Sequence, residues 1–289
     1  MPELPEVDAL ATSLDALLSD RVIARIDLAA LNVLKTVDPP VHSLEGQQIE
    51  SVRRTGKYLV VKAGGLSLVL HLARAGWVHW RDDMPSEPPR PGKGPLALRL
   101  VAVTTDGESV GGFDLTEAGT KKGAAAYVVR DAMDVPGIAR LGPDALDPTL
   151  TTEALARILF SHGRAQIKGV LRDQAVIAGV GNAYSDEILH AARISPFAPA
   201  DGVAAAALHR AMREVLEGAC EVARRADMTR LKAEKKASMK VHGRTGQPCP
   251  DCGDTIREVS FADRSLQYCP ACQTGGKLLA DRRMSRLLK

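Results

Sequence analysis

The chain has 289 residues, 45% of them hydrophobic, which is enough for about two domains with cores of their own. No apolar run approaches the roughly 20 residues that cross a bilayer, and the first residues lack the pattern of a signal peptide, so we expect a cytoplasmic protein without membrane contact. The net charge of +3 is unevenly distributed along the chain. Residues 205–289 contain 17 basic and 10 acidic residues (+7), so the remaining residues contain 21 basic and 25 acidic residues (−4). This asymmetry favours an anionic partner such as nucleic acid, with a solvated basic face as an equal alternative.

The first predicted element is a helix over residues 7–20, where apolar residues recur on one face. Two acids, Glu3 and Glu6, stand at its start. Acids at a helix N-terminus interact favourably with the helix dipole, by under about 1 kcal/mol each. The alternative is a chemical role beside Pro2, which would become a secondary amine if Met1 were removed.

Four β-rich runs follow, separated by Gly or Asp-Gly breaks, and predict an antiparallel sandwich or flattened barrel. They cover residues 22–35, 49–64, 66–80 and 95–107. The segment Arg81–Pro95 between the last two is Pro-rich and predicts a mobile loop. We place a domain boundary within residues 135–150, because Thr151 or Thr152, followed by Glu153, begins helical patterns that continue to about Arg230.

Within the helical part, one helix stops at the Gly-rich turn Gly179–Asn182 and another begins at once. Backbone N–H groups at such a turn can bind an anion such as a nucleic-acid phosphate, and Asn182 adds a side-chain donor. An ordinary corner between two helices, whose glycines permit close packing, fits the pattern equally well.

Four of the five cysteines form two CxxC pairs separated by sixteen residues: Cys249 with Cys252, and Cys269 with Cys272. This spacing predicts one Zn²⁺ held on a two-stranded ribbon, with a structural role because four thiolates leave no coordination position open. Two disulfides are the alternative, which a cytosolic location disfavours. Cys220 has helical spacing and is interpreted as a small buried hydrophobic residue.

Four segments, in order, resemble the bacterial formamidopyrimidine-DNA glycosylases and endonuclease VIII. They are PELPEVDAL (2–10), RRTGKYLVV (53–61), QAVIAGVGNAYSDEIL (174–189) and the cysteine-rich VHGRTGQPCPDCG…DRSLQYCPACQ (241–273). Together they extend over nearly the whole chain. The resemblance implies a monomer that binds damaged DNA in a cleft between its halves and contains one structural Zn²⁺.

The fold that the resemblance implies is α+β and multidomain. An N-terminal two-layer β-sandwich with the first helix at its edge (1–135) is followed by a helical helix-two-turn-helix DNA-binding domain (136–245). A β-ribbon zinc finger (246–273) and a basic tail (274–289) complete it; we expect the tail to form a short amphipathic helix.

The resemblance also implies a reaction. In this family the initiator methionine is removed and the exposed proline, here Pro2, attacks C1′ of an extruded nucleotide, displaces the base and forms an iminium from which the 3′ and then the 5′ phosphate leave. An N-terminal amine suits this role because its ordinary pKa of about 8 leaves a useful fraction unprotonated at neutral pH. Glu3 is then the general acid and base, and Glu6 positions groups or relays protons.

Phosphate contacts carry over to Lys57, His71, Asn182 and Arg264, with Lys168 as a weaker member of the set. Contacts of this kind position and bend the duplex without reading its sequence.

The chain departs from the family pattern in three places. Arg74 stands where the family has a Met that fills the space of the extruded base, and an Arg can fill it by stacking on bases. An Arg-Arg-Phe-Gly tip is replaced by residues 120–123, where Lys121 and Lys122 can contact phosphate but no aromatic wedge is present. Residues 230–244 lack the Gly-rich run that covers an oxidised purine, which favours an oxidised pyrimidine or an unusual lesion over 8-oxoguanine.

We therefore predict a bifunctional DNA glycosylase and AP lyase of base excision repair, located in the cytoplasm with the nucleoid. The alternative is a non-catalytic protein that keeps the family fold and binds damaged or single-stranded DNA. A zinc-ribbon protein acting on RNA would explain the cysteines but not the N-terminus.

Overall fold

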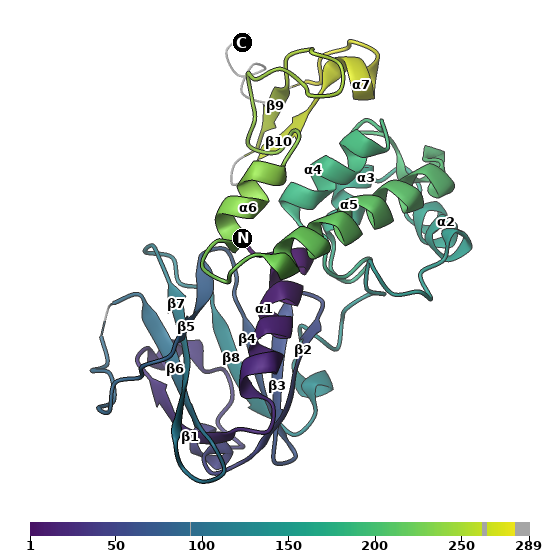
Figure 1. Ribbon diagram of the computed structural model, residues 1–289. Helices are drawn as coiled ribbons and strands as arrows, with labels where there is room; N and C mark the ends of the chain where they lie inside the picture. The colour runs from purple at the N-terminus through teal and green to yellow at the C-terminus, as the bar shows by residue number, and fades with distance from the viewer. Residues whose placement is uncertain (93, 262–264, 281–289) are drawn as a thin grey trace. The chain divides into compact units, whose positions relative to one another are not determined.

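A computed structural model describes residues 1–92, 94–261 and 265–280, and the chain divides into two compact units (Figure 1). The first unit contains residues 1–140 and 223–231. The second contains residues 141–222 and the described residues from 232 onward. The chain thus leaves the first unit after residue 140, returns to it for residues 223–231, and then continues in the second unit.

The first unit consists of one helix and two four-stranded antiparallel sheets. Helix α1 spans Leu4–Leu18. One sheet has the order β1-β6-β7-β5, with β1 at Val22–Leu28, β6 at Leu96–Val103, β7 at Ser109–Glu117 and β5 at Gly76–Arg81. The other has the order β2-β3-β4-β8, with β2 at Ile49–Thr55, β3 at Tyr58–Ala63, β4 at Leu66–His71 and β8 at Ala125–Val129. Short 3-10 helices lie at Leu31–Val33, Val41–Leu44 and Ala132–Asp134.

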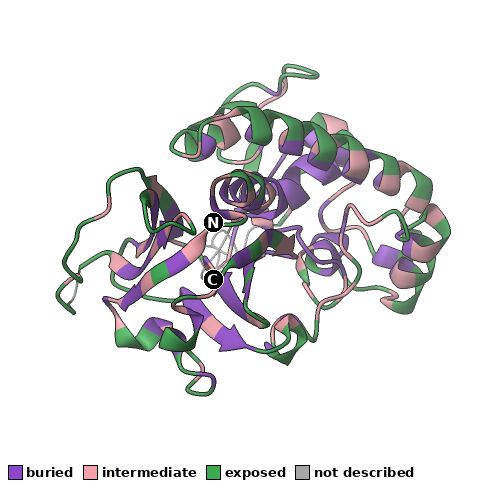
Figure 2. Cartoon of the chain, turned by 60° about the horizontal axis from the view of Figure 1, so that its bottom comes forward, coloured by how far each residue is buried: buried purple, intermediate pink, exposed green. Residues whose placement is uncertain are grey.

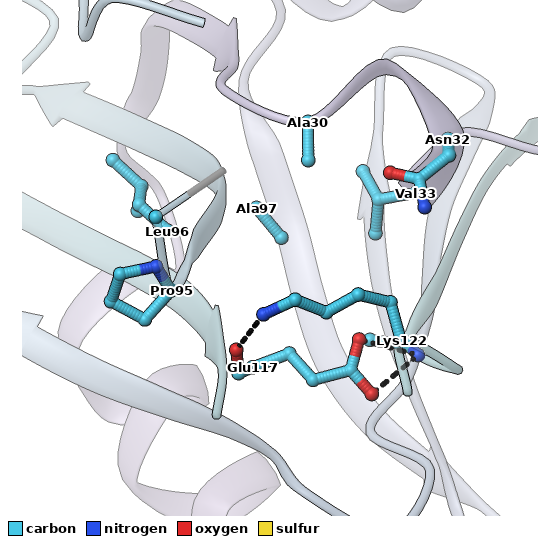
Figure 3. Close-up of a pocket in the computed structure, with 10 residues that line it drawn as sticks. Ala30, Asn32, Val33, Pro95, Leu96, Ala97, Glu117 and Lys122 are labelled. Carbon is cyan, nitrogen blue, oxygen red and sulfur yellow. Dashed lines mark hydrogen bonds between the residues drawn. The ribbon is translucent and has the colours of Figure 1, made fainter. Parts of the chain in front are cut away.

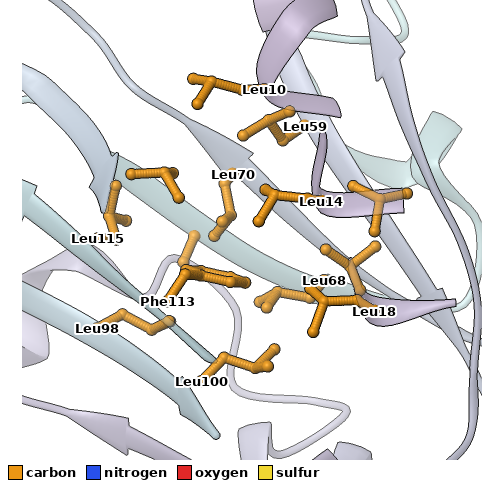
Figure 4. Close-up of a cluster of buried hydrophobic side chains, with 14 of the residues drawn as sticks. Leu10, Leu14, Leu18, Leu59, Leu68, Leu70, Leu98, Leu100, Phe113 and Leu115 are labelled. Carbon is orange, nitrogen blue, oxygen red and sulfur yellow. The ribbon is translucent and has the colours of Figure 1, made fainter. Parts of the chain in front are cut away.

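The core of this unit lies between the two sheets and under α1, as Figure 4 shows. Leu98 pairs in register with Leu115, and Leu100 pairs with Phe113, so that four large side chains of one sheet face the core together. The other sheet contributes leucines from β3 and β4, and α1 adds Leu10, Leu14 and Leu18 at a spacing of four residues. This spacing places one apolar stripe on the sheets, which is why the predicted helix forms at the edge of a sandwich.

The opposite face of the β1-β6-β7 strands is polar, and three of its charges are buried. Asp27, Arg99 and Asp114 are neighbours in the strand register. Arg99 donates to Asp114 through Nε at 2.7 Å and Nη2 at 2.9 Å, a bidentate pair that raises the pKa of Arg99. This pair connects two adjacent strands.

The second unit is helical, with a small ribbon near its end. Its elements are α2 (Thr152–Ser161), α3 (Ile167–Arg172), α4 (Asn182–Ala191), the 3-10 helix Ala200–Gly202, α5 (Ala205–Arg225), α6 (Leu231–Ser238), β9 (Arg257–Ser260), β10 (Ser265–Tyr268) and α7 (Pro270–Thr274). The last turn of α5 and the first residue of α6 belong to the first unit. Helix α2 begins where the sequence predicted, because the Thr151 hydroxyl accepts the N–H of Ala154 at 3.2 Å.

Some predicted elements differ in the structure. The helix expected to stop at the turn Gly179–Asn182 already ends at Arg172, because Ala178 pairs with residues 143–145 and the chain leaves the helix before it. The β-rich run over residues 22–35 forms a strand only to Leu28, because the N–H groups of Ala29 and Ala30 both donate to Ala97 O and the chain then turns into a 3-10 helix. In the C-terminal tail, residues 275–280 are not helical, and Leu279 N–H donates to the Tyr268 hydroxyl at 2.8 Å. The rest of the predicted tail helix lies outside the described residues.

Figure 2 shows that buried residues concentrate in the strands and on the inner faces of helices, while the connections are mostly exposed. None of the helices in the described part of the chain is long and apolar enough to cross a membrane.

Candidate functional site

The start of α1 brings together the three N-terminal residues that the sequence singled out. Glu3 precedes the helix and Glu6 lies in its first turn, where Glu6 Oε2 accepts the backbone N–H of Glu3 at 2.8 Å. This is one half of a capping box, and the other half, the Glu3 carboxylate accepting the backbone N–H of Glu6, is also present. Both acidic residues are only 2% exposed, and Pro2 is also buried. The first unit therefore holds a proline and two carboxylates at a buried helix start.

Lys57 lies in the turn between β2 and β3 and is 7% exposed. The turn requires a left-handed residue, and Gly56 supplies it with φ +56°. Arg54 braces the turn, since its Nη1 donates to Gly56 O at 3.0 Å and its Nε lies 3.5 Å from the carboxylate of Asp8 on α1. Side chains thus connect α1 to the hairpin that carries Lys57.

His71 ends β4 opposite Tyr58, and their ring centroids are 4.6 Å apart. Burial lowers the pKa of His71, and the neighbouring charge of Lys57 lowers it further. Both effects favour the neutral imidazole, in which one ring nitrogen is an N–H donor. The structure places Lys57 and His71 at the same end of the β3-β4 hairpin.

Arg74 lies in the turn between β4 and β5, and its side chain is exposed. The turn is tight: Ala73 adopts φ +50°, and Gly76 N–H donates to Leu72 O at 2.8 Å. A Cβ on Gly76 would lie 2.2 Å from Leu72 O, so the turn closes only with glycine at that position. Arg74 is consequently presented to solvent on a closely packed turn.

The connection between β7 and β8 carries Lys121 and Lys122, whose surroundings differ. Lys122 Nζ turns back and donates to the backbone carbonyl of Glu117 (Figure 3). The Glu117 carboxylate, 3% exposed, accepts the N–H of Gly123 at 2.7 Å and that of Ala124 at 3.1 Å. The adjoining cavity of about 20 Å³ has room for a water molecule and not for a base. Lys121 is exposed and makes no hydrogen bond or ion pair within the described residues.

Lys168 on α3 is 5% exposed, and its ammonium is surrounded by acceptors from α4. Nζ donates to Asn182 O at 3.0 Å, to Ser185 Oγ at 2.8 Å and to Asp186 Oδ1 at 2.6 Å. These three acceptors match the three N–H donors of an ammonium. The structure places Lys168 as a connection between two helices, and its DNA contact stays a prediction. Arg264, another predicted phosphate contact, lies outside the described residues.

Asn182 begins α4 directly after the Gly-rich turn. Its Nδ2 donates to Ser265 O on β10 at 2.9 Å, and its Oδ1 is buried with no hydrogen-bond partner among the described residues. The turn is braced by Gln174, which accepts the N–H of Gly179 at 3.1 Å and donates to Val180 O at 2.7 Å. No sequence pattern indicated this role of Gln174, although the residue begins the motif. The DNA contact of Asn182 stays a prediction.

Two adjacent acids on α4, Asp186 and Glu187, hold the segment that precedes the zinc finger. Glu187 accepts the backbone N–H groups of residues 240, 241 and 242 at 2.8–3.0 Å, and Asp186 Oδ2 lies 2.7 Å from His242 Nδ1. Burial raises the pKa of Glu187, while the three N–H donors oppose that shift. Sequence reasoning missed these contacts because two consecutive acids in a helix read as a solvated face.

The four cysteine sulfurs of the predicted zinc site lie within 4.8 Å of one another. Cys249 and Cys272 are 3.9 Å apart, and Cys252 and Cys269 are 3.4 Å apart. A tetrahedral Zn²⁺ with Zn–S bonds of about 2.3 Å separates its sulfurs by about 3.8 Å, so the donor set fits. Burial raises the pKa of the Cys269 thiol to about 11, and a bound metal ion replaces such protons. Cys220 is buried in α5, apart from this cluster.

Comparison with known proteins identifies the family. Residues 1–120 match the model of the formamidopyrimidine-DNA glycosylase N-terminal domain, residues 141–230 match the H2TH domain of the same enzymes, and residues 246–275 match a zinc finger found in FPG and IleRS. A formamidopyrimidine-DNA glycosylase of Desulforamulus reducens is 33% identical in an alignment of 286 positions that covers 94% of this chain and 99% of the relative. The chain belongs to the formamidopyrimidine-DNA glycosylase family.

Other members of the formamidopyrimidine-DNA glycosylase family are similar in sequence or in fold. A Mycobacterium tuberculosis protein, named an uncharacterized formamidopyrimidine-DNA glycosylase-like protein, is 59% identical over 152 residues, 52% of this chain and 94% of its own. The crystal structure of MutM (Fpg) from Thermus thermophilus matches with a TM-score of 0.78 at 29% identity, over 96% of this chain and 100% of that one.

The Lactococcus lactis glycosylase, solved with DNA containing an AP site, has a TM-score of 0.80 at 23% identity, over 94% of this chain and 99% of that one, which shows a common fold. These matches confirm the predicted fold class: an N-terminal β-sandwich, a helical H2TH domain and a C-terminal zinc finger. They also confirm the predicted cofactor, one structural zinc held by the four cysteines.

Proposed function

We propose that this protein is a DNA glycosylase with AP lyase activity in base excision repair, and that Pro2 is its nucleophile. The observation that carries the proposal is the burial of Glu3 and Glu6 beside Pro2, each 2% exposed. An interaction with the helix dipole stabilises by about 0.3–1 kcal/mol and an N-cap by about 0.5–2 kcal/mol, whereas burying a carboxylate costs several kcal/mol. Two acids held beside Pro2 are what this reaction requires, one to transfer protons and one to hold the arrangement.

The reaction begins once Met1 is removed, because only then is the nitrogen of Pro2 an amine and not an amide. That nitrogen attacks C1′ of an extruded nucleotide, the glycosidic bond breaks, and the base leaves with a proton. Glu3 protonates the ring oxygen O4′ as the sugar opens, which gives the iminium, and then removes a proton from C2′ so that the 3′ phosphate departs. Glu6, whose carboxylate accepts the Glu3 N–H, holds this arrangement.

We propose that basic residues of the first unit bind phosphates of the DNA backbone. Lys57 and His71 lie at one end of the β3-β4 hairpin, where an ammonium and a neutral imidazole N–H can hold phosphates beside the lesion. Arg74, on its closely packed turn, fills the space of the extruded base by stacking on its neighbours. Lys121 is the candidate contact from the β7-β8 connection. We propose that the protein acts as a monomer in the cytoplasm.

For the substrate, we propose an oxidised pyrimidine and not 8-oxoguanine. Where purine-specific relatives carry a Gly-rich covering loop, this chain has the helix α6. Lys235 of this helix lies with its ammonium 4.7 Å from the ring centroid of Tyr184, which ties α6 to α4. A segment that is already helical and tied down has less freedom to fold over a large base, which supports a smaller lesion.

Borohydride trapping tests the catalytic part of this proposal. The full chain is incubated with an oligonucleotide that contains an abasic site, and the adduct is located by mass spectrometry of the N-terminal peptide. We expect a covalent adduct on Pro2 in chains that have lost Met1, none on Pro2 in chains that retain Met1, and strongly reduced strand cleavage with Glu3→Gln. An oligonucleotide with tetrahydrofuran in place of the abasic sugar is the matched control, because it has no aldehyde and gives no adduct.

The same experiment distinguishes catalysis from binding alone. A chain that has lost Met1 and binds the abasic oligonucleotide without forming an adduct would be a non-catalytic DNA-binding protein. Base release is then measured with a matched set of duplexes containing thymine glycol, 5-hydroxyuracil or 8-oxoguanine. We expect the two pyrimidines to be released faster, and faster release of 8-oxoguanine would contradict the substrate part of the proposal.

A further inference from the structure

His190 lies in the last turn of α4, is 1% exposed, and has no part in the function proposed above. Its Nε2 lies 3.3 Å from the Sγ of Cys249. The nearest carboxylate, that of Asp251 in the same CxxC turn, lies farther away, with its Oδ2 4.0 Å from Nε2. The hydrogen-bond partner of this nitrogen is therefore the sulfur.

The other ring nitrogen of His190 shows why the sulfur contact matters. Nδ1 is buried and has no hydrogen-bond partner among the described residues. An apolar side chain would fill the same space without leaving a buried polar atom unsatisfied. What an imidazole adds here, and a leucine or phenylalanine cannot, is an N–H directed at Cys249. A zinc-bound cysteine is a thiolate and only accepts, so the proton is on Nε2.

The charge of the metal site explains why Cys249 needs a hydrogen-bond donor. One Zn²⁺ and four thiolates sum to −2, and Cys249 is only 2% exposed, so its negative charge needs donors from the protein. Backbone N–H groups donate to Cys252 and to Cys269 within the finger itself. Cys249 receives its side-chain donor from outside the finger, from helix α4.

We propose that His190 is a positioning residue of the zinc site: its Nε2–H donates to the Cys249 thiolate, holds that sulfur in its ligating orientation, and connects the metal to helix α4. Gln273 makes a parallel connection, since its Nε2 donates to Ile194 O just beyond α4 and its Oε1 accepts the N–H of Cys269, both at 2.9 Å. Two metal ligands of the zinc finger, Cys249 and Cys269, are thus connected to helix α4 and its end through His190 and Gln273.

Zinc retention in full-chain variants tests this role. We expect His190→Leu to release zinc about 10–100-fold faster than wild type to a competing chelator, as followed with a zinc-sensitive dye. His190→Gln, which keeps an N–H donor, is expected to recover most of the loss. His209→Leu, which changes a partly exposed histidine on α5, is the matched control and is expected to match wild type. Wild-type release from a folded His190→Leu would overturn the proposal.

A measurement on the unaltered protein covers the case in which His190→Leu does not fold. The zinc is replaced by ¹¹³Cd, and the histidines are labelled with ¹⁵N. We expect His190 to carry its proton on Nε2 and to show a scalar coupling through the hydrogen bond to ¹¹³Cd, which packing without a hydrogen bond cannot produce. A proton on Nδ1, or the absence of that coupling, would refute the contact with Cys249.

Discussion

Lys168→Met removes a cation that the structure places between α3 and α4. Removing one partner of a buried ion pair costs about 3–5 kcal/mol, because the other charge is left uncompensated. Asp186 retains His242, whose Nδ1 lies 2.7 Å from Oδ2, so the expected loss is at the lower end, about 3 kcal/mol. The Met side chain keeps most of the apolar volume, and the loss therefore reports on charge and hydrogen bonds.

Urea unfolding followed by far-ultraviolet circular dichroism measures this loss, since the helical unit contains Lys168. In an Asp186→Asn background the same Lys168→Met change should cost less by more than about 1 kcal/mol, because the carboxylate that it leaves unpaired is gone. DNA binding is measured in parallel over a range of salt concentrations. The slope of log affinity against log salt distinguishes two roles of Lys168: it stays unchanged in Lys168→Met where the ammonium serves its three internal acceptors alone, and it falls by about 0.9 where the ammonium also contacts a phosphate.

Lys121→Met is the matched control for this experiment. Lys121 is exposed and without internal contacts in the described part of the chain, so its loss should leave the stability within about 0.5 kcal/mol of wild type. If Lys121 contacts a phosphate, the salt slope falls by about 0.9. The reasoning is refuted if Lys168→Met retains wild-type stability and instead shows the reduced slope, because Lys168 would then be a DNA contact.

Three further outcomes are expected. Asp114→Ala leaves the buried Arg99 without its bidentate partner and should lower the free energy of unfolding by about 3 kcal/mol in urea titrations, whereas the exposed Asp83→Ala should not. The NMR titration of His71 should give a pKa below 6.5, and this pKa should rise in Lys57→Met. Because folding lowers the pKa of His71, this histidine has no effect on the free energy of unfolding above about pH 6.5 and destabilises the folded state as the pH falls below 6.5. Chelation of zinc should make residues 246–275 sensitive to protease while the sandwich, which has its own core, stays resistant.

Each of these outcomes has a result that would contradict it. Asp114→Ala with wild-type stability would mean that water reaches Arg99. A His71 pKa unchanged by Lys57→Met would mean that burial alone lowers it. Zinc-free protein with a protease-resistant finger would mean that its small apolar cluster suffices without metal.

The sequence by itself determined those features that depend on local spacing. The apolar repeat predicted α1, the threonines at 151 and 152 predicted the start of α2, and two CxxC pairs predicted the zinc site, because each of these patterns is fixed by the geometry of one short segment. The four motifs that carry the family resemblance predicted the fold class for the same reason: their residues were recognisable before their contacts were known.

Tertiary structure alone decided what distant residues do for one another. No sequence pattern indicated that Asp186, 18 residues away, lies 2.6 Å from the ammonium of Lys168. His190 was an unremarkable helix residue until Cys249, 59 residues away, lay within hydrogen-bond reach. A sequence pattern records which side chains are present, but the burial of a charge and the partner that satisfies it arise only when segments far apart in the chain pack together.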